Sequence, residues 1–163
     1  NCPKSDQFVS HGFVYKKQHN DDKRPVGKRL FCSNRSGKTG CGSTLRLYLT
    51  EQIPNLAYTT VHLTLFLTAL IAGATIAQAY QKAIACDHDP RNAYRWLNKL
   101  QGKLIDYRQI LKVSTPVPAN PLLSRTRRFH IMLPTLDRLF EKNGIGHSDL
   151  CAQYQYRYQQ AFV

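Results

Sequence analysis

The chain has 163 residues, which is enough for one large domain or two small ones. Its 23 basic and 10 acidic residues give a formal net charge of +13, which favours a polyanionic partner such as nucleic acid. The few carboxylates form no cluster along the sequence, so the two-metal chemistry of a nuclease or a transposase core is not supported.

The uncharged run Ile53 to Gln81 is long enough to cross a bilayer. It contains Pro54, Asn55, His62 and several threonines, which make it too polar for a membrane span. We therefore expect helices buried inside the protein and no membrane partner. The five cysteines are an odd number, which argues against a disulfide framework and for a reducing compartment.

Residues 1–52 predict a small β-rich module. Strands are expected at Phe8–Tyr15, Gly27–Phe31 and Thr44–Leu49, because these runs are rich in β-branched, aromatic and leucine residues and are separated by polar or glycine-rich turns. A piece of this size buries little apolar surface, so it needs a staple such as a bound metal ion.

Three cysteines of this module, Cys2, Cys32 and Cys41, suggest that the staple is zinc, because thiolates are preferred ligands of Zn²⁺. His11 is the best candidate in the chain for the fourth ligand, with His19 behind it. The zinc would be structural, since no glutamate lies near these residues to act as an acid or base.

The spacing of these cysteines departs from the usual zinc ribbon. Ser5 stands where a Cys-x-x-Cys pair would place its second cysteine, and eight residues separate Cys32 from Cys41. The chain begins at Asn1 without a methionine, so a further cysteine upstream is a third candidate for the fourth ligand. In the alternative interpretation the cysteines are small buried hydrophobes.

The module also carries many cations, among them Lys28, Arg29, Arg35 and Lys38. We expect these side chains to contact phosphates, which adds affinity without sequence information. The alternative is a solvated basic surface.

Residues 53–112 predict a helical domain. A helix at Thr59–Leu70 is apolar nearly all round, and Gly73 follows it. Thr75 caps a short helix that ends at Ala83. After a break, a long helix is expected to run from Asp89 to Lys112, with the Asp89 carboxylate as N-cap and Pro90 at the first helical position.

The long helix is amphipathic. Its apolar positions are 93, 96, 97, 100, 104, 107 and 111, which places Trp96 in the core. The opposite face carries Arg91, Asn92, Arg95, Asn98 and Lys99. A short helix, a turn and a capped helix with Arg and Asn in its first turns are typical of a DNA-reading helix-turn-helix. Arg binds guanine edges and Asn binds adenine. The alternative is an ordinary amphipathic helix with a solvated basic face.

Residues 113–121 contain three prolines and predict a linker. Beyond it, residues 122–163 predict a helical tail in which Pro134 kinks or interrupts a first helix. Ser148 is expected to cap a last helix, Asp149–Phe162. Its aromatic side chains point to more than one side, so they could dock on the helix-turn-helix, on a second copy or on another protein.

The chain opens with Cys2-Pro3 and continues with the segment His11-Gly-Phe-Val-Tyr-Lys16, a basic strand into Cys32 and the ending Cys41-Gly-x-Thr44. Together these features resemble the N-terminal zinc ribbon of insertion-sequence transposases. A ribbon followed by a helix-turn-helix is similar to the InsA-type proteins of bacterial insertion elements. The resemblance covers roughly residues 1–105. It implies that ribbon and helices together bind element ends or a promoter, with the catalytic domain in a separate region.

The sequence therefore predicts an α+β protein: a zinc-ribbon module (1–52), a helix-turn-helix domain (53–112), a linker (113–121) and a helical tail (122–163). We expect a sequence-specific double-stranded DNA-binding protein that acts as a regulator or accessory factor of a mobile element, in the bacterial cytoplasm and on the nucleoid. The alternatives are an RNA or single-strand binding module and a non-catalytic subunit of a larger enzyme. No catalytic constellation stands out, so we do not expect an enzyme.

Overall fold

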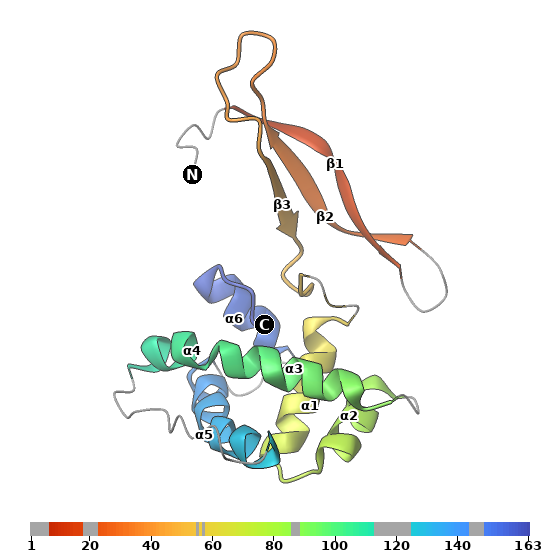
Figure 1. Cartoon of the computed structure of the whole chain (residues 1–163), viewed down its shortest axis with the longest axis vertical. Helices are drawn as coiled ribbons and strands as arrows, with labels where there is room; N and C mark the ends of the chain where they lie inside the picture. Colours follow the sequence, from red (N-terminus) through yellow and green to blue (C-terminus); the bar gives the residue numbers. More distant parts are fainter. Residues whose placement is uncertain are drawn as a thin grey trace. The chain divides into compact units, whose positions relative to one another are not determined.

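The computed structural model describes residues 7–17, 23–54, 56, 58–85, 89–112, 125–143 and 149–163. Within these residues a three-stranded antiparallel sheet precedes six helices, which confirms the predicted α+β class (Figure 1). The chain divides into two compact units, Asn1–Ala57 and Tyr58–Val163. We call them the sheet unit and the helical unit and describe each by itself.

The sheet consists of β1 (Phe8–Lys17), β2 (Lys23–Cys32) and β3 (Thr44–Tyr48), in the order β1-β2-β3. All three strands were predicted, and β2 begins earlier than expected. Its register places Lys28 directly opposite Phe13 of β1 and Leu47 of β3. Residues in such opposite positions share one face of the sheet.

The described part of the sheet unit has a very small core. Its fully buried apolar residues are Val26, Cys32 and Ile53. Near Ile53, the Lys16 ammonium donates a hydrogen bond to the Ile53 carbonyl oxygen at 2.7 Å and another to Gln52 Oε1 at 3.3 Å. Burial lowers the pKa of Lys16. The small number of buried side chains is consistent with the expectation that this unit needs additional stabilisation.

The helical unit is built around its first helix. Its described helices are α1 (Thr60–Ile71), α2 (Ile76–Ile84), α3 (Arg91–Gly102), α4 (Leu104–Leu111), α5 (Arg125–Asn143) and α6 (Leu150–Tyr158). Helix α1 packs against α2, α5 and α6. It was expected to be central to the core, and Phe66 and Leu67 are fully buried.

The connection between α1 and α2 follows from two residues. Gly73 adopts a φ of +91°, which favours glycine, and this ends the first helix. Thr75 then forms a capping box with Gln78: the Gln78 N–H donates to the Thr75 hydroxyl, and Gln78 Oε1 accepts from the Thr75 N–H. The cap expected at Thr75 is confirmed.

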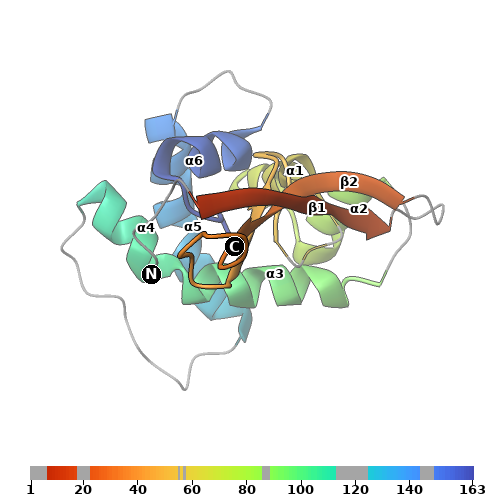
Figure 2. The same ribbon diagram turned by 90° about the horizontal axis from the view of Figure 1, so that it is seen from above.

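The prediction of a single long helix from Asp89 to Lys112 is wrong. The segment is divided at Lys103 into α3 and α4, and Figure 2 shows α4 leaving α3 at an angle. Gly102, the last residue of α3, disfavours a continuous helix at this point. The bend still leaves Leu104 and Tyr107 buried in the helical core, as their spacing predicted.

The predicted linker, residues 113–121, lies outside the described residues. The helices that follow it in the sequence differ from expectation in part. Pro134 lies inside α5, which continues through it. Burial of five side chains on one face of α5 offsets the hydrogen bond that a proline removes; these are Phe129, Met132, Leu136, Leu139 and Phe140. The last helix is capped by Asp149 and ends at Tyr158, not at Phe162. The expected cap Ser148 lies outside the described residues.

The residues predicted as a tail pack into the helical unit. Tyr107 of α4 contacts the ring of Tyr154 at a centroid distance of 5.6 Å and stacks on Phe162 at 5.3 Å. The Tyr107 hydroxyl donates a hydrogen bond to the Phe162 carbonyl oxygen. Burial is the largest cause that raises the pKa values of both phenols, that of Tyr154 to about 12. The C-terminal segment therefore docks on the helical unit of its own chain.

Candidate nucleic-acid interface

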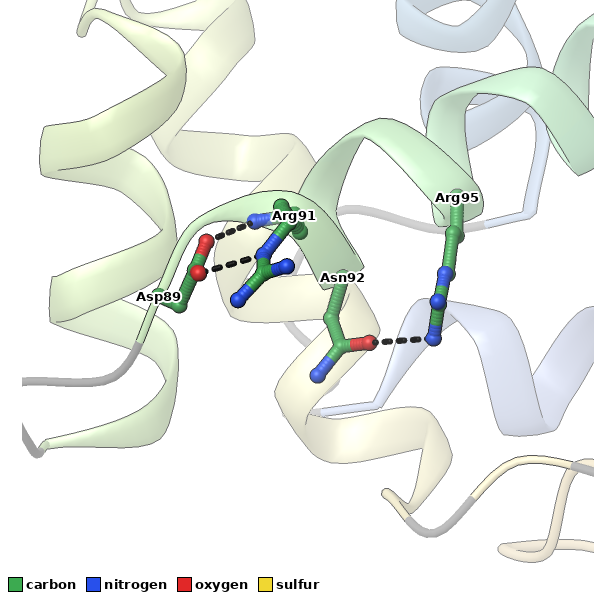
Figure 3. A network of polar contacts seen from close by, with 4 residues as sticks. All are labelled: Asp89, Arg91, Asn92 and Arg95. Carbon is green, nitrogen blue, oxygen red and sulfur yellow. Dashed lines mark hydrogen bonds and ion pairs between the residues drawn. The ribbon is translucent and has the colours of Figure 1, made fainter.

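Helix α3 begins with a polar network (Figure 3). The Arg91 N–H donates to Asp89 Oδ1 at 2.9 Å, and the Arg91 Nε donates to Asp89 Oδ2. These two hydrogen bonds, the backbone one first, lower the pKa of the Asp89 carboxyl. The helix begins at Arg91 with Pro90 in the N-cap position, one residue later than predicted. The carboxylate nevertheless accepts an N–H of the first turn, as expected.

The inner face of α3 anchors the helix in the core. Its buried residues are Ala93, Trp96, Leu97 and Leu100. Trp96 is 2% exposed, and its ring meets those of Phe66 in α1 and Tyr80 in α2 edge-on, both at a centroid distance of 5.4 Å. Such packing fixes both the position and the rotation of the helix.

The outer face of α3 is polar and positively charged. Arg91, Arg95, Asn98 and Lys99 are exposed, and Asn92 is partly exposed. Figure 3 shows Arg91, Asn92 and Arg95 on the same side of the first turns, where Arg95 donates to Asn92 Oδ1 at 3.4 Å. The structure therefore brings together the five residues predicted for this helix. Guanidinium and amide groups in such a row can bind base edges or phosphates.

The segment between α2 and α3 is longer than in a compact helix-turn-helix. It comprises residues 85–90, since α2 ends at Ile84 and α3 begins at Arg91, whereas the usual turn has about three or four residues. Ala85 adopts a left-handed conformation with a φ of +55°. Residues 86–88 lie outside the described part of the chain.

The four cations predicted in the sheet unit do not form one group. Lys28 and Arg29 are consecutive in β2, so their side chains point to opposite faces of the sheet. The Arg29 guanidinium donates to the Phe13 carbonyl oxygen through Nε at 3.3 Å and Nη2 at 3.2 Å. Phosphate contact from both faces at once would require the partner to wrap around the sheet.

The other two cations lie in the loop between β2 and β3. Arg35 is exposed, and its guanidinium carbon lies 5.9 Å from the centre of the Phe31 ring. The Lys38 N–H donates to the Arg35 carbonyl oxygen at 3.1 Å, and Lys38 is partly exposed. These residues present positive charge at the end of the sheet where β2 finishes.

The predicted metal ligands are only partly brought together. The Cys41 N–H donates to Cys32 Sγ at 3.3 Å, and the Gly42 N–H donates to the Cys32 carbonyl oxygen at 2.9 Å. His11 lies instead beside the Phe31 ring, at a centroid distance of 5.7 Å. Within the described residues no three His, Cys, Asp or Glu side chains gather as a metal site. Cys2 and His19 lie outside them.

Sequence reasoning missed two features. Asp149 connects α6 to α1 through Thr60 and Thr64, a contact for which the sequence gives no local signal. One face of the sheet exposes Phe13, Tyr15 and three leucines. The alternation of Leu45, Leu47 and Leu49 was a signal for this face, because alternate residues of a strand share a face.

No protein-family model matches this sequence, and comparison with curated proteins and with solved structures finds no significant match. None of the helices in the described ranges combines the length and the apolar character that crossing a membrane requires.

Proposed function

We propose that this chain is a sequence-specific double-stranded DNA-binding protein and that α3 is its recognition helix. The observation that carries the proposal is the division of α3 into two faces. Trp96 and Leu97 anchor one face in the core, while Arg91, Asn92 and Arg95 occupy the exposed face. A single helix fits the major groove of B-DNA, and a recognition helix contacts bases mainly through its N-terminal residues.

The roles of the side chains follow from their chemistry and position. Arg91 and Arg95 bind guanine through O6 and N7, and Asn92 binds adenine through N6 and N7. Asn98 and Lys99, about two turns into the helix, contact bases or the adjoining phosphates. Because Asn92 already accepts a hydrogen bond from Arg95, we expect the contributions of these two side chains to base recognition to be coupled.

In this proposal the sheet unit supplies phosphate contacts through Arg35 and Lys38, in the loop after β2, and through either Lys28 or Arg29, which lie on opposite faces of that strand. A structural Zn²⁺ held by Cys32, Cys41, Cys2 and a fourth ligand would stabilise the unit. The pairing of Cys32 with the Cys41 backbone supports the first two ligands. The position of His11 beside Phe31 weighs against His11 as the fourth.

The resemblance to insertion-element proteins suggests the biological setting. We infer a regulator or accessory factor of transposition that binds element ends or a promoter, in the cytoplasm and on the nucleoid. The same role allows a second copy or a protein partner to dock on the C-terminal helices, where Tyr156 is 72% exposed. If the chain served only as such an interaction subunit, charge reversal at Arg91 and Arg95 would leave its function intact.

The test is a selection from random duplex DNA with the purified full chain near physiological salt, with zinc content measured on the same sample. We expect an enriched motif of several base pairs. Arg95→Ala should relax the preference at one position of the motif and cost about 1–3 kcal/mol of binding free energy. Binding without any motif would overturn sequence-specific recognition by α3.

Arg138→Ala is the matched control, because Arg138 is exposed on α5 and its removal lowers the charge equally. It should leave the motif unchanged. A second comparison is Lys28→Ala, which should weaken binding to all duplexes alike and lower the slope of affinity against salt by about one. A sample that holds no zinc would refute the metal part alone.

A further inference from the structure

One face of the sheet is covered with exposed apolar and aromatic side chains. The exposed fractions are 51% for Phe13, 53% for Tyr15, 45% for Leu45, 47% for Leu47 and 52% for Leu49. A group of large apolar side chains left in water at this density marks an interaction surface.

The strand register shows that these side chains share a face. Phe13 and Leu47 flank Lys28 from the two neighbouring strands, so all three lie on the same side of the sheet. The rings of Phe13 and Tyr15 meet at a centroid distance of 6.3 Å, edge to face. Leu45 and Leu49 alternate with Leu47 along the chain and extend the same side. We call this surface the aromatic sheet face.

Charge decides between the possible occupants of this face. Residues 1–57 contain ten basic and four acidic residues, a net charge of +6. Two copies that met through this face would bring these charges together. A polyanion is attracted, and its charge can be met by Lys28, which is exposed in the middle of the face. A polyanion that also packs against half-exposed aromatic rings is one that carries flat π-surfaces of its own.

We propose that the aromatic sheet face binds single-stranded nucleic acid, with unpaired bases stacked on Phe13 and Tyr15 and a phosphate beside Lys28. The bases of a duplex are already stacked on each other, so they offer no face to these rings, whereas single strands do. This function is distinct from duplex recognition by α3. It would let the protein hold an opened strand while the helical unit holds duplex DNA.

The test measures fluorescence anisotropy of labelled oligothymidine and oligouridine, each of about 15 nucleotides, with the full chain at one fixed salt concentration. The double variant Phe13→Ala/Tyr15→Ala should bind both strands about tenfold or more weakly. The two oligonucleotides distinguish DNA from RNA as the source of the strand. Tyr156→Ala is the matched control, since it removes an exposed aromatic ring from α6.

A second variant separates stacking from apolar contact. Phe13→Leu/Tyr15→Leu keeps most of the apolar area but removes the π-faces, so it should lose strand binding almost as fully as the alanine variant. A protein-docking surface would tolerate leucine. Lys28→Arg should retain binding and Lys28→Ala should lower its salt dependence.

Unchanged strand affinity in the alanine variant would overturn the proposal. So would a wild-type chain that binds no strand and forms a dimer that the same substitutions dissociate. The duplex assay keeps this result separate from the proposed function. Arg91→Ala/Arg95→Ala should abolish the duplex motif and leave strand binding unchanged, and the Phe13/Tyr15 variants should do the reverse.

Discussion

The Asp149 carboxylate accepts a hydrogen bond from the Thr64 hydroxyl at 3.2 Å, across 85 residues of sequence. It also accepts from the Thr60 hydroxyl, and it caps α6 by accepting the Ala152 N–H at 2.9 Å. The Cys151 N–H in turn donates to the Thr64 hydroxyl at 3.1 Å. Both threonines are buried in α1. One carboxylate therefore starts the last helix and attaches it to the first.

Loss of this carboxylate should destabilise the helical unit. Asp149→Ala removes a helix cap and the hydrogen bonds that Asp149 accepts from two buried hydroxyls, which together should cost about 2–4 kcal/mol in the free energy of unfolding. Urea unfolding followed by Trp96 fluorescence measures the change. Asp149→Asn can still cap the helix and should cost less. Asp137→Ala, at an exposed position of α5, should change stability by less than about 0.5 kcal/mol.

Trp96 should be the most costly single truncation in α3. Trp96→Ala leaves a cavity between the rings of Phe66, Tyr80 and Tyr58, and we expect a loss of about 3–5 kcal/mol. Because the variant lacks the fluorescent probe, unfolding is followed by circular dichroism. Tyr156→Ala removes an exposed ring and should be nearly neutral. Equal effects of the two substitutions would contradict the burial of Trp96.

Two glycines with open surroundings should respond to alanine in opposite directions. A Cβ atom at Gly102 or Gly73 would meet nothing within 4 Å. Gly102 ends α3 without a positive φ, so Gly102→Ala should stabilise the protein by about 0.5–1 kcal/mol. Gly73 has a φ of +91°, so Gly73→Ala should destabilise it by about 1 kcal/mol or more. Thermal unfolding of both variants provides the comparison.

His62 should make the helical unit less stable in mild acid. Burial lowers the pKa of His62 below its usual 6.5, and its Nδ1 lies 2.9 Å from the Thr59 hydroxyl. Folding thus favours the neutral ring. Its contribution is complete above the unfolded pKa of 6.5 and is lost as the pH falls through the lower folded pKa.

The measurement is urea unfolding of the wild type and His62→Gln from about pH 7 to about pH 5. The free energy of unfolding should fall more steeply with acid in the wild type, because other titrating groups are common to both proteins. Parallel pH profiles would show that His62 does not contribute to the slope.

The elements of this fold were predictable where their causes are local. The three strands, the helix cap at Thr75 and the two faces of α3 follow from alternation, from a capping residue and from a helical repeat. Gly102 is a local cause of the division between α3 and α4, but the extent of the bend depends on how Leu104 and Tyr107 enter the core. The continuation of α5 through Pro134 depends likewise on packing, which offsets the missing hydrogen bond.

The candidate sites were predictable to different degrees. The outer face of α3 could be predicted from helical periodicity alone, and its five predicted residues lie together in the structure. The set of metal ligands could not be predicted in this way, because it depends on which side chains meet in space. The sequence could pair Cys32 with Cys41 through the ribbon pattern, whereas the face on which His11 lies depends on the irregular register between Ser10 and Phe13. Asp149 could not be assigned to α1, since its partners are distant along the chain.

The contact between Arg91 and Asp89 has a consequence for recognition. A long arginine side chain has about 2 kcal/mol of rotamer entropy to lose when it is immobilised. Here the Asp89 carboxylate accepts a hydrogen bond from the Arg91 Nε, which Figure 3 draws as a dashed line. Both side chains are largely exposed, so this ion pair restricts the arginine only in part, and that part of the ordering occurs when the protein folds. A ligand that meets Arg91 finds a partly ordered side chain, and less entropy is lost at the moment of association.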